Sequence, residues 1–393
     1  MKVVFINSAS NDNVIAYLNK VNKIRTNYVQ QKWDYAFSLA MYKLLKDDFI
    51  GLSVSSVSSF PIRSRCFYNK EMYMPKSNTT ILKSFNLPFV KQWMYMTILR
   101  RKLTEIVKEY KSEGVVFVTN CIQYISAHPV FEVAKKYQIK VLSIVPDLPD
   151  FDMCSYPGPS FIINKYKSLN LKYEKDYDGY ICFSKHQMKY LNPNAPYIVM
   201  EGFCDCSSLP KQEIKKSPKF VVMYAGGVRK AYGIKELVDG FIKANINNSE
   251  LWIFGDGDYV PELKEIRYSS VKYMDIVDKQ DVLKYEQEAS LLVNPRPSHE
   301  TFSYLSFPSK ILEYMASGTT LLTSHLGSIP AEYDDYLLYF DEISADGIAE
   351  KLSEIYSLSN YQEIGVRAQK FVQKNKNTSS QAERVVEFIR TID

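Results

Sequence analysis

Short apolar runs rich in β-branched residues alternate with longer amphipathic stretches along this chain, and the alternation occurs in two series. The first series of apolar runs lies at residues 3–6, 51–54, 115–118, 140–145, 179–183 and 197–200, and the second at 220–224, 250–254, 271–273, 291–293, 320–323 and 336–340. Such runs are typical of strands that are buried on both faces of a parallel sheet. Helical patterns separate them at 33–46, 90–110, 131–137, 233–244, 281–288 and 310–315. The pattern predicts two α/β domains with doubly wound, Rossmann-like parallel sheets.

The length of the chain and one polar segment fit this division. A chain of 393 residues is too long for one ordinary hydrophobic core. Residues 209–218 are polar, charged and bracketed by prolines, which predicts a linker. We therefore predict a first domain over 1–205, a second over 219–370, and a C-terminal helix within 371–393 that packs back on the first domain. Two such domains would face each other across a cleft, with ligands at the carboxyl ends of the strands.

Composition and charge exclude several classes of protein. The net charge of +5 comes without a dense Lys/Arg tract that carries a base-reading motif, so a nucleic-acid partner is not expected. No run of 18 apolar residues is present, and the first apolar run is too short for a signal peptide. The six cysteines form no pair of CxxC motifs, which argues against structural zinc and for a reducing compartment. We expect a cytoplasmic protein whose membrane contact is peripheral.

The first candidate site is a glycine-rich turn after the run at 220–224. Gly226 and Gly227 are followed by Arg229 and Lys230, and a helix is predicted to begin at Gly233. Glycines let the backbone approach a phosphate, a helix N-terminus is electropositive, and the two cations add charge-assisted donors. The spacing matches neither the dinucleotide fingerprint nor a P-loop. From spacing alone, an ordinary turn between a strand and a helix fits equally well.

The second candidate site is the segment 307–318, which follows the strand predicted to end near Asn294. Pro308 and Ser309 favour a helix start there. The free backbone N–H groups of such a start, together with the ammonium of Lys310, suit a diphosphate. Glu313 lies about one helical turn further on. There its carboxylate is placed to accept hydrogen bonds from ribose hydroxyls.

These segments resemble the donor site of the family 4 retaining glycosyltransferases, which have the GT-B fold, and in particular the branch that assembles bacterial surface polysaccharides. The resemblance covers nearly the whole chain and is specific only in its second half. The matching segments are residues 224–227, 234–238, 253–258, 294–296, 307–318 and 327–330, with shorter matches at 146–147, 183–185 and 201–202.

The resemblance implies roles for particular residues. Arg229, Lys230 and Lys310 would neutralise the leaving diphosphate, and Glu313 would bind the ribose. The donor-binding residues that it implies are Gly226, Gly227, Gly255, Asp256, Arg296, Ser309, Lys310 and Glu313. No metal and no cofactor are expected, because cations and a helix end already neutralise the diphosphate; the sequence Asp256-Gly257-Asp258 is interpreted as a loop.

Two positions depart from the family pattern. The family often has an acidic residue eight positions before the ribose-binding glutamate, where this chain has Leu305. It also usually has a lysine where this chain has Tyr232, so Arg229 and Lys230 would substitute from earlier in the loop. The first departure leaves recognition of the donor sugar open.

Candidates for the acceptor side lie in the first half. Asp147 is our first choice for orienting the acceptor, because it occupies the loop where many relatives carry a histidine, and Asp150 is the second. Each fits a solvated loop acid or a helix cap equally well. Arg63 and Arg65, in a basic and aromatic loop, are predicted to contact the acceptor. The apolar and basic stretch at 87–102 fits a helix on an anionic membrane surface or a core helix with a basic end.

Together these features predict an enzyme that moves a sugar from a nucleotide diphosphate donor, with a UDP-sugar favoured, to a glycan or a polyprenyl-diphosphate-linked acceptor. By resemblance the transfer would be retaining and metal-independent, and would serve capsule, exopolysaccharide or lipopolysaccharide assembly. Stabilising the charge of the departing diphosphate would be the main source of catalysis. Two alternatives stay open: a UDP-sugar epimerase on the same fold, and a non-catalytic, nucleotide-sugar-binding partner subunit.

Overall fold

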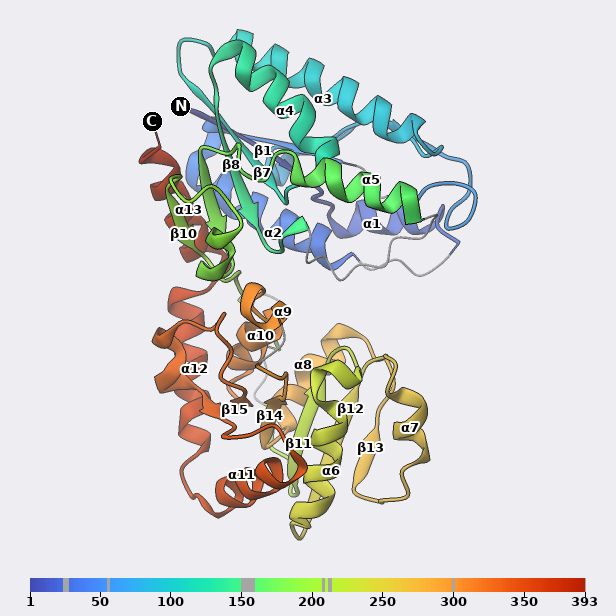
Figure 1. Cartoon of the computed structure of the whole chain (residues 1–393), viewed down its shortest axis with the longest axis vertical. Helices are drawn as coiled ribbons and strands as arrows, with labels where there is room; N and C mark the ends of the chain where they lie inside the picture. The colour runs from blue at the N-terminus through green and yellow to red at the C-terminus, as the bar shows by residue number, and fades with distance from the viewer. Residues whose placement is uncertain are drawn as a thin grey trace. The chain divides into compact units, whose positions relative to one another are not determined.

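The computed structural model describes residues 1–23, 28–54, 57–149, 160–206, 209–210, 214–298 and 301–392. The chain divides into two compact units, the first formed by Met1–Met200 with Thr378–Asp393 and the second by Glu201–Asn377. The chain thus passes between the units at residues 200–201 and 377–378. Each unit is built around its own sheet (Figure 1).

The described residues of the first unit form an eight-stranded sheet with the order β10-β9-β8-β7-β1-β2-β5-β4. Neighbouring strands are parallel except for β4 and β5. The strands are β1 (Lys2–Asn7), β2 (Phe49–Ser53), β4 (Met72–Met74), β5 (Thr79–Ile81), β7 (Val115–Asn120), β8 (Lys140–Val145), β9 (Gly179–Cys182) and β10 (Tyr197–Val199). A separate antiparallel pair joins β3 (Tyr68–Asn69) to β6 (Ser84–Phe85).

Helices cover both faces of this sheet. Helices α3 and α4 pack together on one face, and α2 and α13 pack together on the other (Figure 1). Helix α13 is also held to the edge strand, because Arg384 donates to the Val199 carbonyl over 2.8 Å and Gln381 to the Met200 carbonyl over 3.3 Å. The helices are α1 (Asp12–Asn19), α2 (Val29–Leu45), α3 (Val90–Glu109), α4 (Tyr124–Tyr137), α5 (Ser160–Leu171) and α13 (Thr378–Arg390).

The second unit has a parallel sheet with the order β13-β12-β11-β14-β15-β16. Its strands are β11 (Phe220–Ala225), β12 (Ser249–Phe254), β13 (Val271–Tyr273), β14 (Leu291–Asn294), β15 (Leu321–Thr323) and β16 (Leu338–Tyr339). Its helices are α6 (Ile234–Ala244), α7 (Val260–Glu265), α8 (Lys279–Glu288), α9 (Thr301–Leu305), α10 (Ser309–Ser317), α11 (Ala345–Ser357) and α12 (Gln362–Asn375). Successive strands step outward from β11 to β13, and the chain then returns to place β14 on the other side of β11.

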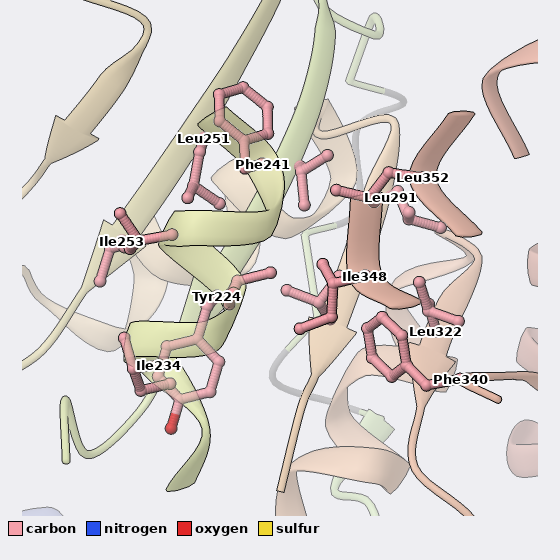
Figure 2. Packing of buried hydrophobic residues seen from close by; sticks show 14 of the residues in the cluster. Tyr224, Ile234, Phe241, Leu251, Ile253, Leu291, Leu322, Phe340, Ile348 and Leu352 are labelled. Atoms are coloured by element: carbon pink, nitrogen blue, oxygen red, sulfur yellow. The ribbon is translucent and has the colours of Figure 1, made fainter. Parts of the chain in front are cut away.

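The core of the second unit lies between this sheet and the packed pair α6 and α11. Phe241 of α6 and Ile348 and Leu352 of α11 meet side chains from β12, β14 and β15 (Figure 2). Each such side chain contributes roughly 1.5–3 kcal/mol on burial. This packing fixes the strands whose carboxyl ends carry the candidate site.

The prediction of two doubly wound α/β domains is confirmed by these sheets and their helix layers. Among the described residues, no helix is both long and apolar enough to span a bilayer.

Candidate functional site

The candidate site of the second unit lies at the carboxyl edge of its sheet, around β11. Strand β11 has β12 on one side and β14 on the other, so the connections from β11 and β14 leave toward opposite faces. In doubly wound sheets, ligands bind at such a switch point. The loops after β11, β12 and β14 contain most of the residues that the sequence singled out for the donor.

Close backbone contacts hold these three loops together. Gly226 donates to the Phe254 carbonyl over 3.0 Å, and Val228 donates to the Asp256 carbonyl over 2.9 Å. At Gly255, with φ of 122°, a Cβ atom would lie 1.9 Å from the Gly226 carbonyl oxygen, so only glycine fits there. At Gly233, with φ of 75°, a Cβ atom would lie 2.2 Å from the Pro295 carbonyl oxygen after β14.

Two arginines flank one aromatic ring above these loops. The guanidinium carbons of Arg229 and Arg296 lie 5.7 Å and 4.8 Å from the ring centroid of Tyr232. Such cation–π contacts hold a guanidinium in place over the ring. Tyr232 is the position where the family pattern would have a lysine, and here its ring supports two other cations.

Lys230 and the Asp256–Asp258 segment are engaged in the loop itself. The Lys230 ammonium pairs with Glu262 of α7, and its backbone N–H donates to Asp258 over 2.9 Å. Asp256 accepts from the Gly257 N–H over 2.8 Å. No group of three or more His, Cys, Asp or Glu that could hold a metal ion occurs among the described residues. The two aspartates thus hold backbone groups of the loop.

Helix α10 begins beside the glycine-rich turn. The Tyr314 hydroxyl donates to the Ala225 carbonyl over 3.0 Å and accepts from the Ala225 N–H over 2.7 Å, which ties α10 to the end of β11. Pro308 precedes the helix and Ser309 is exposed at its first position. The Pro308 side chain makes no capping hydrogen bond, and the Ile311 N–H donates to the Pro308 carbonyl over 2.9 Å, so the N–H groups that suit an anion are those of Ser309 and Lys310.

Four charged side chains gather between α10 and α8, and we call them the Lys–Glu cluster: Lys279 and Glu286 of α8, and Lys310 and Glu313 of α10. The Lys310 ammonium contacts one carboxylate oxygen of Glu313, and the Lys279 ammonium lies 3.2 Å from the other. Lys310 also lies 3.9 Å from Glu286, which is fully buried. The cluster thus joins Lys310 and Glu313, which share helix α10, to two charged side chains of α8.

Electrostatics in the cluster hold Glu313 ionised. Burial by itself raises the pKa of the Glu313 carboxyl, but Lys310 and Lys279 outweigh it and lower that pKa to about 2. Burial lowers the pKa of Lys310, and the carboxylates of Glu313 and Glu286 outweigh it, so this pKa is raised. Burial and the neighbouring Glu313 raise the pKa of Glu286 well above its ordinary value.

Leu305, where the family pattern would have an acidic residue, is a core side chain. It ends α9 and is buried, so this position offers no carboxylate to a donor sugar. Nearby, Ser328 donates to the Ser303 carbonyl over 2.8 Å. The polar residues His299 and Glu300, which precede α9 in the sequence, lie outside the described residues.

The acceptor-side candidates lie in the first unit on separate loops. Asp147 follows β8 and is exposed, and Asp150 lies outside the described residues. Arg63 and Arg65 are both exposed on the segment between β2 and β3. The structure therefore gathers the donor-side residues of the second unit at one sheet edge, while those of the first unit come from different loops.

Sequence reasoning missed Lys279 and Glu286, and also a buried carboxylate in the first unit. Asp34 of α2 is buried at the carboxyl ends of β1 and β7, where it accepts from the Ser8 N–H and hydroxyl, each over 2.7 Å. Gln30 donates to it over 3.0 Å, and Asn120 donates as well. The sequence held one sign of both carboxylates, which is an acidic residue on the apolar face of a helix. Asp34 lies three positions before the buried Phe37, and Glu286 lies three positions after the buried Leu283.

The comparisons with known proteins agree with this geometry. Residues 219–357 match the sequence model of the family Glycosyl transferases group 1. Sucrose-phosphate synthase from Thermosynechococcus elongatus superposes on the chain with a TM-score of 0.65 at 13% identity, covering 100% of this chain and 99% of its own. HepE of Anabaena, in complex with UDP, superposes with a TM-score of 0.62 at 12% identity over 100% of both chains. A trehalose-6-phosphate structure from E. coli, bound with UDP-2-fluoro glucose, gives 0.64 at 10% identity over 100% of both.

No curated protein matches the chain by sequence. The structural neighbours nevertheless identify the fold, because the chain superposes over its full length on proteins with the GT-B fold of two Rossmann-like domains. Residues 219–357 of the second unit thus match the group 1 glycosyl transferases, and the chain as a whole has the GT-B fold.

Proposed function

We propose that the chain is a retaining glycosyltransferase that transfers a sugar from a UDP-sugar, with the Lys–Glu cluster and the start of α10 holding the diphosphate and ribose. The observation that carries the proposal is the position of Lys310 and Glu313. They lie at the uncapped start of a helix that Tyr314 ties to the glycine-rich turn. The choice of UDP is supported by neighbours whose structures contain UDP or UDP-glucose.

The proposed chemistry follows from the charges. The bond between the anomeric carbon and the diphosphate oxygen breaks, and the acceptor oxygen bonds to the same face of that carbon. The acceptor proton passes to the departing diphosphate, so no protein base is required. Lys310, Arg229 and Arg296 with the α10 N–H groups stabilise the leaving charge, and Lys230 and Ser309 line the same edge. Gly226, Gly227 and Gly255 give the diphosphate access to the backbone, and Asp147 orients the acceptor.

We propose that transfer needs no metal ion, because these cations supply the charge that a metal would supply. Asp256 and Asp258 support this interpretation, since both already accept backbone N–H groups. The test is transfer by the purified chain from radiolabelled UDP-sugars, with and without EDTA, and NMR of the product's anomeric configuration. We expect activity that survives EDTA and a retained configuration. Loss of activity with EDTA would reject metal independence, and an inverted product would reject retention.

The same assay separates two other functions. The absence of an acid at the buried Leu305 favours one of them, a nucleotide-sugar-binding subunit without activity of its own. Transfer or donor hydrolysis by the chain alone contradicts the subunit. Conversion of a UDP-sugar in the absence of acceptor favours an epimerase over a transferase.

We further propose a lipid-linked acceptor at an anionic membrane, as in surface-polysaccharide assembly. Ile62, Phe89 and Trp93 of the first unit have exposed fractions of 79%, 77% and 64%. Their two segments are joined by Asn86, which donates to Ser64 over 2.7 Å and to the Arg65 carbonyl over 2.8 Å. Exposed Arg63 and Arg65 add positive charge to these apolar side chains, a combination that suits an anionic bilayer surface.

Co-sedimentation with vesicles tests this surface. The wild type is expected to bind phosphatidylglycerol vesicles and not phosphatidylcholine vesicles. The double variant Phe89→Ser/Trp93→Ser should lose vesicle binding. Each substitution removes an apolar side chain that would enter the bilayer surface, and burial of each CH₂ group contributes about 0.8 kcal/mol. Val29→Ser, a similarly exposed apolar residue on α2, is the matched control. Equal vesicle binding by the double variant and the wild type would reject the membrane surface.

A further inference from the structure

Glu286 occupies an environment that an ionised carboxylate does not favour. Its side chain is fully buried on α8, and neither carboxylate oxygen has a hydrogen-bond donor among the described residues. The Lys310 ammonium, 3.9 Å away, is already in contact with Glu313. A buried carboxylate that accepts no hydrogen bond is costly, and in practice such a group takes up a proton instead.

The groups around Glu286 define what its proton changes. The charged and titratable groups that face it or its helix end are Lys279 on α8, Lys310, Glu313 and Tyr314 on α10, Cys204 beside Glu313 and Lys279, and Lys216 at the end of α8. Lys216 donates to the Ala289 carbonyl and to Thr319, whose hydroxyl donates to the Glu286 carbonyl oxygen. The Lys216 ammonium therefore donates to the Ala289 carbonyl and the Thr319 hydroxyl and not to the Glu286 carboxyl.

The charge of the Lys–Glu cluster depends on this one proton. With Glu286 neutral, two ammonium groups face one carboxylate and the cluster carries one positive charge. With Glu286 ionised, two ammonium groups face two carboxylates and the cluster is neutral. A neutral cluster would attract a diphosphate less strongly, and a second carboxylate would hold Lys310 back from it.

We propose that Glu286 is a positioning residue that holds a proton, donates it in a hydrogen bond to Glu313, and so leaves the cluster with one net positive charge for the donor diphosphate. This inference rests on the proposed function, since it takes a nucleoside diphosphate as the ligand. Glu286 acts through Lys310 and Glu313 and does not itself contact the donor. Burial and the Glu313 carboxylate raise the pKa of Glu286 well above its ordinary value, which agrees with a proton held at neutral pH.

We therefore expect the affinity for UDP to fall at alkaline pH, and we expect this fall to depend on Glu286. As the pH rises, the wild type loses the proton, the cluster becomes neutral and UDP binding weakens. Glutamine at position 286 keeps a neutral side chain with N–H donors at every pH. Glu286→Gln should therefore remove this part of the pH dependence, whatever its affinity at neutral pH.

The experiment is calorimetric titration of UDP into wild type, Glu286→Gln and Glu288→Gln from about pH 6 to about pH 10. Glu288, on the same helix, is the matched control and should behave as the wild type. We expect the affinity of the wild type to fall by about 10-fold or more across this range, and that of Glu286→Gln by less than about 3-fold. The same alkaline fall in Glu286→Gln would overturn the inference while leaving the proposed function standing. Absence of UDP binding by the wild type at every pH would overturn both.

A second measurement needs no UDP. Infrared spectroscopy of the wild type in heavy water should show a protonated carboxyl band at neutral pH that disappears at alkaline pH, and the band should be missing in Glu286→Gln where that variant folds. No protonated carboxyl band at neutral pH would overturn the inference even if Glu286→Gln proved too unstable to titrate.

Discussion

At the scale of single residues, Asp34 shows how a buried carboxylate links this fold to pH. Burial raises its pKa to about 6, although Ser8, Gln30 and Asn120 all donate to it and oppose the shift. The ordinary value is 3.8. The folded chain therefore holds the Asp34 proton over a pH range in which the unfolded chain has already lost it.

The contribution of Asp34 to the stability of the fold decreases as the pH rises. Below about pH 4 both states are protonated, so the contribution of Asp34 to stability is fully present. As the pH rises through about 6 that contribution is lost, up to about 3 kcal/mol. Urea unfolding of wild type and Asp34→Asn, measured between these pH values, should show a decline in the wild type that the variant lacks. Asp47→Asn, at an exposed site, should keep the decline; a parallel decline in Asp34→Asn would contradict the assignment.

Two members of the Lys–Glu cluster could be predicted from the sequence and two could not. Lys310 and Glu313 share one helix start, so spacing along the chain places them together. Lys279 and Glu286 join them only because α8 packs beside α10, and a sequence carries no direct record of which helices meet. The single clue to Glu286 was its position three residues after the buried Leu283.

At the scale of elements, the site depends on loops that touch through their backbones. The turn after β11 meets the turn after β12 at Gly255, where the space for a Cβ atom is filled by the Gly226 carbonyl oxygen. A side chain there would push apart the two loops that border the proposed diphosphate position.

Gly255→Ala is therefore expected to lose stability and UDP affinity together. Gly114 also has a positive φ, of 76°, but a Cβ atom there would lie 3.9 Å from its nearest neighbour, so Gly114→Ala isolates the cost of the backbone angle. That cost is about 1–2 kcal/mol. In urea unfolding, we expect Gly255→Ala to lower the free energy of unfolding by more than this cost. We also expect it to weaken UDP binding by about 10-fold or more. Equal losses of stability for the two variants, with UDP affinity unchanged in Gly255→Ala, would contradict this account of the loops.

Most of the predicted elements have an apolar run or a helical period that stands out in the sequence, although helix α11, of 13 residues, was not predicted. The strands β3, β4, β5 and β6 were not predicted, because they span only two or three residues and carry no apolar run that distinguishes them from loops. Helix α1 was not predicted either; it has eight residues, and its start depends on Asn11, which accepts from the Val14 N–H. Short elements of this kind form through contacts that the rest of the fold supplies.

At the scale of the whole molecule, a buried charge network lies next to both points where the chain passes between the units. Lys376 and Glu201, both in the second unit, have side-chain exposed fractions of 3% and 2%, and their charged atoms lie 3.0 Å apart. Lys376 also lies 2.7 Å from Glu332. The network joins residues that are 175 positions apart in the sequence, so it closes the second unit where its chain enters and leaves.

Breaking this network should destabilise the second unit. Lys376→Met leaves Glu201 buried without its cation, which typically costs about 3–5 kcal/mol. The double variant Lys376→Met/Glu201→Gln should recover part of the loss, and Lys370→Ala, exposed on helix α12 just before Lys376, should have little effect. Urea unfolding measures all three. A loss below about 1 kcal/mol for Lys376→Met would contradict the role of this network.

The two-domain architecture could be predicted because strand and helix patterns alternate over the whole chain. A few missed or misplaced elements do not hide that alternation. The donor side could be predicted because its residues lie close together in sequence. Recognition of the donor sugar could not be predicted, since the expected acid is the buried Leu305 and the neighbouring positions 299 and 300 lie outside the described residues. The acceptor side draws on separate loops of the first unit, which sequence spacing does not relate to one another.

The most direct test of the central claim is UDP binding by wild type, Lys310→Met and Glu313→Gln, measured by calorimetry with circular dichroism to verify folding. Each variant removes a charge-assisted contact worth about 1.5–3 kcal/mol, so UDP affinity should fall by about 10- to 100-fold while the fold is kept. Lys284→Ala, which removes an exposed lysine of α8 outside the cluster, should bind as the wild type does. Undiminished UDP affinity in both cluster variants would contradict the assignment of the donor site to α10.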